Sequence, residues 1–197
     1  MSDLQVINAQ VRQCKKCNIS SLCKSPVPGV GTVGAKLCIV GEAPGVDEDF
    51  LGIPFVGRAG QELQTELWDA GFRDPEEFFV TNIVKCRPPN NRDPRPQEIA
   101  NCNPWLDLQL ESVDPKAILC VGRVAANTLL KTKLTMGQLR TYGGSYLSIP
   151  VFTIYHPSWI LRDNQQHRGR SIEDLRKVRA FLEETNETHS NLSREVP

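Results

Sequence analysis

Residues 37–45, with the sequence LCIVGEAPG, join a short apolar run to a loop that contains glycine and proline. The run at 37–40 is typical of a strand that is buried on both faces. Three further runs have the same character, at residues 78–84, 117–121 and 151–155. Their starts are 41, 39 and 34 residues apart, which leaves room for a helix between successive strands.

Apolar residues at helical spacing fill those gaps. They predict helices over 59–70, over 96–110 with Pro96 at its first position, and over 124–130. Alternation of strands and helices predicts an α/β fold of three layers, α/β/α, around a central four-stranded, mainly parallel sheet. We expect one domain over residues 1–184. Residues 185–197 are polar and without periodicity, which predicts a disordered tail.

Composition excludes several classes of protein. Of the 197 residues, 40% are hydrophobic, and no apolar run is long enough to span a bilayer, so we expect no membrane association. The 23 basic and 23 acidic residues balance, which argues against a histone-like polycation. Seven cysteines and an N-terminus without a signal sequence predict a reducing, cytoplasmic location.

Charge is nevertheless segregated along the chain. Basic residues predominate in 1–41, 85–95 and 162–179, whereas acidic residues predominate in 42–77. Each segment fits either a solvated helix face or a nucleic-acid-binding face. A G-x-G-x-x-G pattern at 29–34 lacks a preceding strand, so we interpret it as a plain loop and not as a dinucleotide site.

The cysteines suggest a metal centre. Cys14 and Cys17 form a C-x-x-C pair, and Cys86 and Cys102 could complete a four-thiolate site. From spacing alone, zinc, an iron–sulfur cluster and unligated reduced thiols all remain open. Cys38 and Cys120 lie inside expected strands and are interpreted as core residues, and Cys23 is unassigned.

Three loops follow expected strands, at residues 41–60, 81–89 and 155–162. We expect them to converge on one edge of the sheet. The amide of Asn82 can both donate to and accept from the edge of a base that offers a donor and an acceptor side by side, and Phe55 can stack on a base. His156 can donate to an oxygen that gains negative charge, and Glu42 can orient water or face a cation.

Each residue alone also has an ordinary structural interpretation. Asn82 could be a turn cap, His156 a structural histidine, Phe55 a core residue and Glu48 a solvated charge. Their occurrence together favours a site.

The combination resembles the family 4 uracil-DNA glycosylases, the iron–sulfur type, over roughly residues 10–180. The motifs that carry the resemblance are C-x-x-C at 14–17, GEAPG at 41–45, G-x-PFVGRAG at 52–60, TNIVKCRPP at 81–89 and HPS at 156–158.

The resemblance implies hydrolysis of the N-glycosidic bond of deoxyuridine in DNA, by a monofunctional enzyme of base excision repair. It implies a [4Fe–4S] cluster on Cys14, Cys17, Cys86 and Cys102. Glu42 and His156 would be catalytic. Asn82, Phe55, Glu48, Ala43 and Gly45 would contact uracil, with Glu48 excluding the methyl group of thymine. Ser158, Leu161 and Arg162 would contact DNA.

A relative in the superfamily traps uracil covalently through a histidine in a basic loop before the last cluster ligand. Residues 88–94 contain no histidine, and Ala43 follows Glu42, so we expect turnover. The expected partner is single- or double-stranded DNA containing uracil, bound by a monomer near the nucleoid. The alternatives are an iron–sulfur redox protein and a catalytically inactive DNA-binding module.

Overall fold

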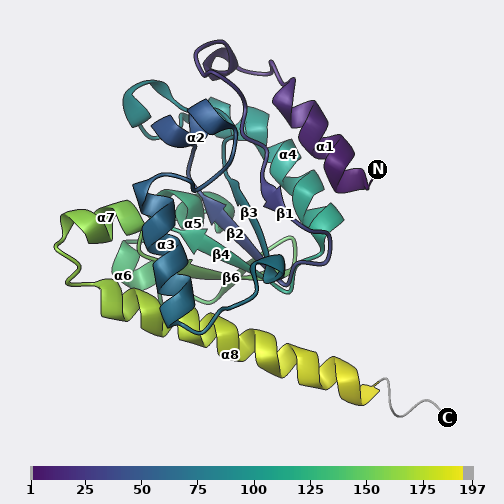
Figure 1. Ribbon diagram of the computed structural model, residues 1–197, viewed down its shortest axis with the longest axis vertical. Helices are drawn as coiled ribbons and strands as arrows, with labels where there is room; N and C mark the ends of the chain where they lie inside the picture. Colours follow the sequence, from purple (N-terminus) through teal and green to yellow (C-terminus); the bar gives the residue numbers. More distant parts are fainter. Residues whose placement is uncertain (1, 193–197) are drawn as a thin grey trace.

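The computed structural model describes residues 2–192 and contains a six-stranded sheet with helices on both faces (Figure 1). The strands are β1 (Val30–Gly31), β2 (Leu37–Gly41), β3 (Phe78–Asn82), β4 (Ala117–Val121), β5 (Gly144–Tyr146) and β6 (Ile149–Ile154). The helices are α1 (Asp3–Arg12), α2 (Val46–Leu51), α3 (Arg58–Asp69), α4 (Pro96–Val113), α5 (Arg123–Leu129), α6 (Met136–Leu139), α7 (Pro157–Arg162) and α8 (Arg168–Leu192). Short 3-10 turns are η1 (Asn18–Ser21), η2 (Pro75–Glu77) and η3 (Pro89–Asn91).

The sheet has the order β1-β3-β2-β4-β6-β5. Its four inner strands, β3, β2, β4 and β6, are parallel neighbours, which confirms the expected mainly parallel α/β fold. All residues of β2 and β4 are buried, because helices cover both faces. The carboxyl ends of the four strands therefore lie at one edge, where Gly41 of β2 is in register with Asn82 of β3.

The expectation of four strands was wrong at the two margins. β1 pairs antiparallel with β3, and β5 pairs antiparallel with β6. β1 lies within the G-x-G-x-x-G segment, so that segment is not a plain loop throughout. Strands of two and three residues that are partly exposed produce no run of buried apolar residues, so the sequence pattern did not indicate them.

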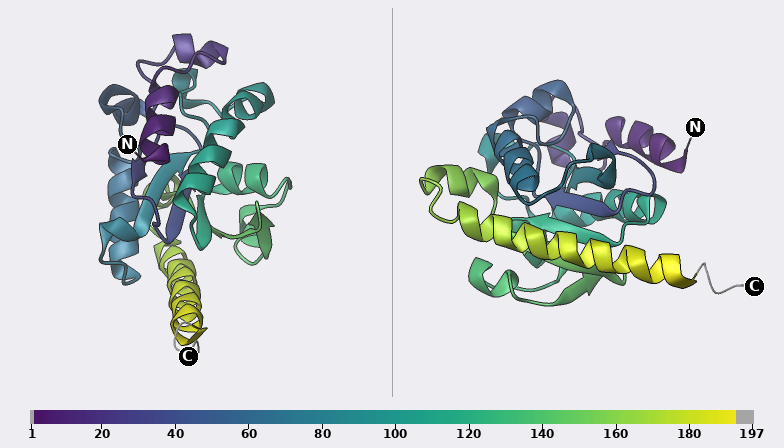
Figure 2. Two further views of the ribbon diagram at one scale, coloured as in Figure 1. Left: turned by 90° about the vertical axis from the view of Figure 1, so that its right-hand side faces the viewer. Right: turned by 60° about the horizontal axis from the view of Figure 1, so that its bottom comes forward.

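The strands separate two hydrophobic cores. Leu37 and Ile39 of β2 face α3 and α8, whereas Cys38 and Val40 face the layer that contains α1, α4, α5 and α6. This alternation follows from the two-residue period of a strand. In the left view of Figure 2, α3 and α4 lie on opposite sides of the strands. Within residues 2–192, no helix combines the length and hydropathy that crossing a membrane requires.

Helix α8 continues further than the polar sequence suggested. Ile172, Leu175, Val178 and Leu182 of α8 pack in the core beside α3. The helix then extends to Leu192, so 185–192, expected to be disordered, are helical. Once the packed turns have formed, adding a further turn requires no new nucleation. Residues 193–197 lie outside the described residues, and the domain boundary at 184 stays a prediction.

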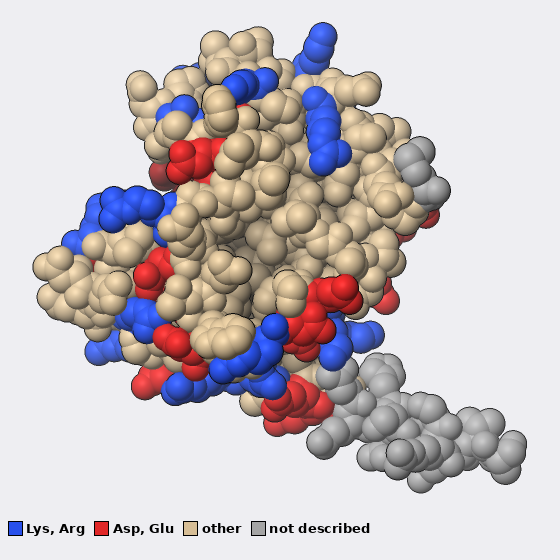
Figure 3. Space-filling model, in the orientation of Figure 1, with Lys and Arg blue, Asp and Glu red and all other residues tan. Residues whose placement is uncertain are grey.

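The contact between α3 and α8 is partly ionic. Arg168 of α8 pairs with Glu62 at 2.8 Å and with Asp69 at 2.7 Å. Acidic and basic side chains accordingly lie next to one another over the lower part of the face in Figure 3. Beneath them, Glu66 is completely buried; Oε2 accepts a hydrogen bond from Ser171, and Oε1 has no partner among the described residues. Burial raises the pKa of Glu66 to about 7.

We expect Glu66→Gln to raise the free energy of unfolding at pH 8 by roughly 1–3 kcal/mol and to leave it nearly unchanged at pH 4. An acid whose pKa rises on folding makes the folded state lose stability as the pH increases from its unfolded value of 4.5 towards 7. Glutamine removes this loss and can still accept from Ser171. Urea unfolding between pH 4 and 8 measures the difference, with the exposed Glu183→Gln as a control. A difference that is independent of pH would contradict this origin.

Candidate active site

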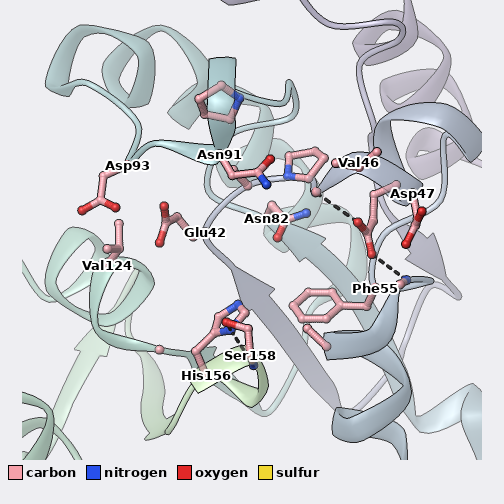
Figure 4. A pocket seen from close by; sticks show the side chains of 18 of the residues that line it. Glu42, Val46, Asp47, Phe55, Asn82, Asn91, Asp93, Val124, His156 and Ser158 are labelled. Carbon is pink, nitrogen blue, oxygen red and sulfur yellow. Dashed lines mark hydrogen bonds between the residues drawn. The ribbon is translucent and has the colours of Figure 1, made fainter. Parts of the chain in front are cut away.

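A cavity of about 620 Å³ lies at the carboxyl ends of the inner strands, where the three expected loops meet (Figure 4). Nine of the ten residues expected to bind uracil or DNA, or to act in catalysis, line it: Glu42, Ala43, Gly45, Glu48, Phe55, Asn82, His156, Ser158 and Arg162. Leu161 is the exception: it is half-buried on α7, and it is not among the described residues that line the cavity.

Gly41 brings Asn82 and Phe55 together. A Cβ atom at position 41 would lie 2.3 Å from Asn82 Oδ1 and 2.6 Å from Phe55 Cζ. The space that a side chain would fill is therefore occupied by the amide and the ring. Asn82 is 2% exposed at the end of β3, so its amide is held at the inner wall of the cavity.

The backbone of Phe55 is strained. Its φ of 55° lies in the left-handed region, which is uncommon for an aromatic residue. The next helix holds it there: a Cβ at Gly60, in the first turn of α3, would lie 1.8 Å from the Phe55 carbonyl oxygen. This close packing sets the direction of the ring, and strain of this kind is concentrated at functional sites.

Glu48 joins the two halves of the first loop. Its Oε2 accepts from the backbone N–H of Gly45 at 3.1 Å, and its Oε1 accepts from that of Gly57 at 2.8 Å. Dashed lines mark both bonds in Figure 4. A carboxylate that is held by backbone donors at both oxygens is a rigid part of the cavity wall.

His156 caps the N-terminus of α7 with its ring. Nδ1 accepts from the backbone N–H of Ser158 at 3.2 Å and lies 2.8 Å from Ser158 Oγ. Because Nδ1 is an acceptor, the proton of the neutral ring is on Nε2. Burial, with a smaller contribution from Arg162, lowers the pKa of His156 to about 4, so the ring is neutral at pH 7. Gly122, with φ 93°, makes room for it, since a Cβ there would lie 2.9 Å from His156 Cβ.

Glu42 follows β2 on the other side of the cavity. Burial, together with the nearby charge of Asp93, raises the pKa of Glu42 to about 7, and Arg123 acts in the opposite direction. Sequence reasoning did not single out Asp93 or Arg123, although both line the cavity. Arg123 comes two residues after β4, so examining the fourth strand end in the same way as the other three would have found it.

The expected cysteine ligands are also neighbours. The thiol of Cys86 interacts electrostatically with those of Cys17 and Cys102, and the thiol of Cys102 interacts with those of Cys14 and Cys17. Cys23 lies beside Cys86. Within residues 2–192, no three Cys, His, Asp or Glu side chains form a ready-made metal site. Cys38 and Cys120 are fully buried in strands, as expected.

Two N–H groups point at these sulfur atoms. The backbone N–H of Lys85 donates to Cys102 Sγ at 3.2 Å, and Trp105 Nε1 donates to Cys14 Sγ at 3.2 Å. Hydrogen bonds to sulfur stabilise thiolates and influence the properties of iron–sulfur clusters. The donor set and its surroundings therefore fit a four-thiolate cluster.

Lys85 links the cysteines to the cavity. Its side chain is 1% exposed, and Nζ donates to Thr81 Oγ1 at 2.6 Å and to the carbonyl oxygen of Asn82 at 2.8 Å. Burial lowers the pKa of Lys85 to about 8. One residue thus holds the backbone of Asn82 and contacts Cys102.

Comparison with known proteins identifies the family. The model of the uracil DNA glycosylase superfamily matches residues 28–183. A type-4 uracil-DNA glycosylase from Archaeoglobus fulgidus is 38% identical over 90% of this chain and 92% of its own length. The chain belongs to the type-4 uracil-DNA glycosylases. A type-4 enzyme from Saccharolobus solfataricus is 40% identical over 92% of this chain and 88% of its own, and one from Sulfurisphaera tokodaii is 38% identical over 91% and 84%. The resemblance inferred from the motifs is thereby confirmed.

We expect Gly41→Ala to lower kcat/KM for uracil release by this type-4 glycosylase at least tenfold, or about 1.4 kcal/mol. The added methyl group would displace the Asn82 amide or the Phe55 ring. Gly137→Ala is the matched control, because a Cβ at this helical position meets no atom within 4 Å. Equal kcat/KM values for the two variants would mean that the close packing at Gly41 is not required.

Proposed function

We propose that this protein hydrolyses the N-glycosidic bond between uracil and deoxyribose in DNA, and so releases uracil and leaves an abasic site. The observation that carries the proposal is that the Asn82 amide, the Phe55 ring and the His156 imidazole line one cavity. The names of the type-4 relatives support the same activity. Neither an electron carrier nor an inactive DNA-binding module needs this combination.

Recognition of the base depends on the inner wall of the cavity. The Asn82 amide can accept from N3–H of uracil and donate to O4, and the Phe55 ring can stack on the base. Glu48, held by two backbone N–H groups, would stand near C5 and crowd the methyl group of thymine. Ala43 and Gly45 leave the backbone accessible beside the base.

Cleavage places negative charge on uracil and positive charge on the sugar. The C1′–N1 bond breaks with its electron pair remaining on the base, and Nε2–H of the neutral His156 donates to uracil O2 as charge develops there. Water adds its oxygen to C1′ and gives up a proton, which the Glu42 carboxylate accepts. The same carboxylate opposes the positive charge of the sugar.

Access to C1′ requires the nucleotide to leave the base stack. Arg162 and Ser158 at the edge of the cavity would contact phosphates of the DNA backbone. Leu161, on the same helix, would enter the space that the nucleotide leaves. We expect a monomer to act in this way on single- or double-stranded DNA, near the nucleoid.

Uracil release is tested with a labelled oligonucleotide that contains one uracil, and with a thymine control. We expect strand breaks after alkali only at uracil, and we expect His156→Ala and Asn82→Ala each to lower kcat/KM at least tenfold, about 1.4 kcal/mol. An intact uracil strand after incubation with folded wild-type protein would overturn the proposed activity. Unchanged kcat/KM in both variants would overturn the assignment of this cavity.

We also propose that Cys14, Cys17, Cys86 and Cys102 hold a [4Fe–4S] cluster. The electrostatic interactions among the four thiols and the N–H groups that point at Cys102 and Cys14 support it. When bound, the cluster supplies a covalent cross-link between the N-terminal segment and the chain from 86 to 102. Lys85 would transmit this restraint to the backbone of Asn82.

We expect Cys86→Ser to lose bound iron and the visible absorbance of the cluster, and to unfold at a lower temperature. Cys120→Ala is the matched control, because Cys120 is a buried strand residue outside the proposed ligand set, and this variant should retain iron. Metal analysis distinguishes iron from zinc. Full iron content in Cys86→Ser would contradict the ligand assignment.

A further inference from the structure

Three charged side chains from three separate elements line the cavity and interact electrostatically. Glu42 follows β2, Asp93 lies in the loop between η3 and α4, and Arg123 is the first residue of α5. All three line the cavity. In Figure 4 the carboxylates of Glu42 and Asp93 are adjacent. Asp93 therefore places a second negative charge beside the carboxylate that the proposed reaction uses.

The loop that carries Asp93 is held in place by a partly buried ion pair. Arg92 donates to both oxygens of Glu98, at 2.9 and 2.6 Å, and Glu98 is 7% exposed. Arg92 also donates to the backbone carbonyl oxygen of Asp93 at 3.0 Å. The backbone of Asp93 is thus held by the fold, and its exposed side chain extends from this fixed point at the edge of the cavity.

Asp93 and Arg123 act on Glu42 with opposite signs. Burial is the main cause of the raised pKa of Glu42, which is about 7; Asp93 raises it further, whereas Arg123 lowers it. The other charged or titratable side chains that line the cavity are Asp47, Glu48, Arg58, Arg92, His156 and Arg162. A pKa near 7 means that modest changes in either neighbour alter the fraction of Glu42 that is ionised at neutral pH.

We propose that Asp93 and Arg123 are a pair of positioning residues that control, in opposite directions, when the Glu42 side chain carries its negative charge. The proposal rests on the proposed function, because it concerns the carboxylate that faces the sugar and accepts the proton from water. Arg123 keeps part of the Glu42 population ionised, and Asp93 restricts ionisation at acidic pH. The rate of uracil release should then rise with pH as Glu42 loses its proton.

The pH dependence of uracil release tests the proposed role of Asp93 and Arg123. If the two residues were merely structural, their substitutions would not shift the pH profile in opposite directions. We expect Asp93→Asn to shift the acidic limb of the kcat/KM profile to lower pH, and Arg123→Gln to shift it to higher pH, each by about half a unit or more. Asp114→Asn is the charge-matched control. Asp114 caps the C-terminus of α4 in a left-handed conformation that asparagine also adopts, before β4 and so at the opposite edge of the sheet.

A second measurement does not depend on activity. This measurement is an NMR titration of protein with carbon-13 in its glutamate carboxyl groups. The Glu42 resonance is identified as the one that is absent from the spectrum of Glu42→Gln, and its chemical shift as a function of pH reports the ionisation of Glu42. We expect this titration to shift to lower pH in Asp93→Asn, to higher pH in Arg123→Gln, and not at all in Asp114→Asn. Melting curves establish that each variant is folded.

The outcomes separate the two proposals. If the wild type releases no uracil, the proposed function fails, and the NMR titration still measures the effect of the pair. If uracil is released and neither variant shifts the titration of Glu42 or the acidic limb of the kcat/KM profile, the proposed role of Asp93 and Arg123 is overturned. Loss of activity at every pH in Asp93→Asn, with no shift in the titration, would also overturn it, because Asp93 would then act on DNA directly.

Discussion

The inner wall of the cavity, formed by Asn82 and Phe55, depends on the absence of a side chain at position 41. Register in the sheet places Gly41 opposite Asn82, and the loop that follows α2 returns Phe55 to the same point. Any β-carbon at position 41 would lie within 3 Å of the amide and of the ring. Gly60 has a similar effect, because the absence of a side chain there lets α3 approach the carbonyl group of Phe55. The side chains of Asn82 and Phe55 form the wall, and the two glycines allow them to pack in this arrangement.

Buried polar groups hold the surrounding elements to this wall. Lys85, almost fully buried, joins Thr81 and the carbonyl group of Asn82 through Nζ, and its backbone N–H contacts Cys102. Burying an ammonium group is costly unless hydrogen bonds replace its hydration. The two short hydrogen bonds of Nζ provide this replacement. In the same way, the two backbone donors to Glu48 allow a carboxylate to serve as a fixed wall.

Burial also acts on the two groups to which the proposed reaction assigns proton transfers. Burial favours the neutral form of both His156 and Glu42, but with different consequences. A neutral imidazole with Nδ1 occupied by Ser158 can still donate from Nε2. A neutral carboxylic acid cannot accept a proton from water, so the proposed reaction requires the ionised form of Glu42, which the charge of Arg123 favours. The charges around Glu42 therefore bear directly on the role that the proposed reaction gives it.

Several features followed from the sequence by itself. The four inner strands, the helices that begin at Arg58, Pro96 and Arg123, and the convergence of the three loops could be predicted, because buried strands and amphipathic helices leave periodic apolar patterns. The motifs also indicated the family. The edge strands β1 and β5 and the helical residues 185–192 were missed, because their formation depends on a neighbouring strand or on turns already packed elsewhere. Only the tertiary structure placed Asp93 and Arg123 beside Glu42, since electrostatic effects depend on distances between elements that are far apart in the chain.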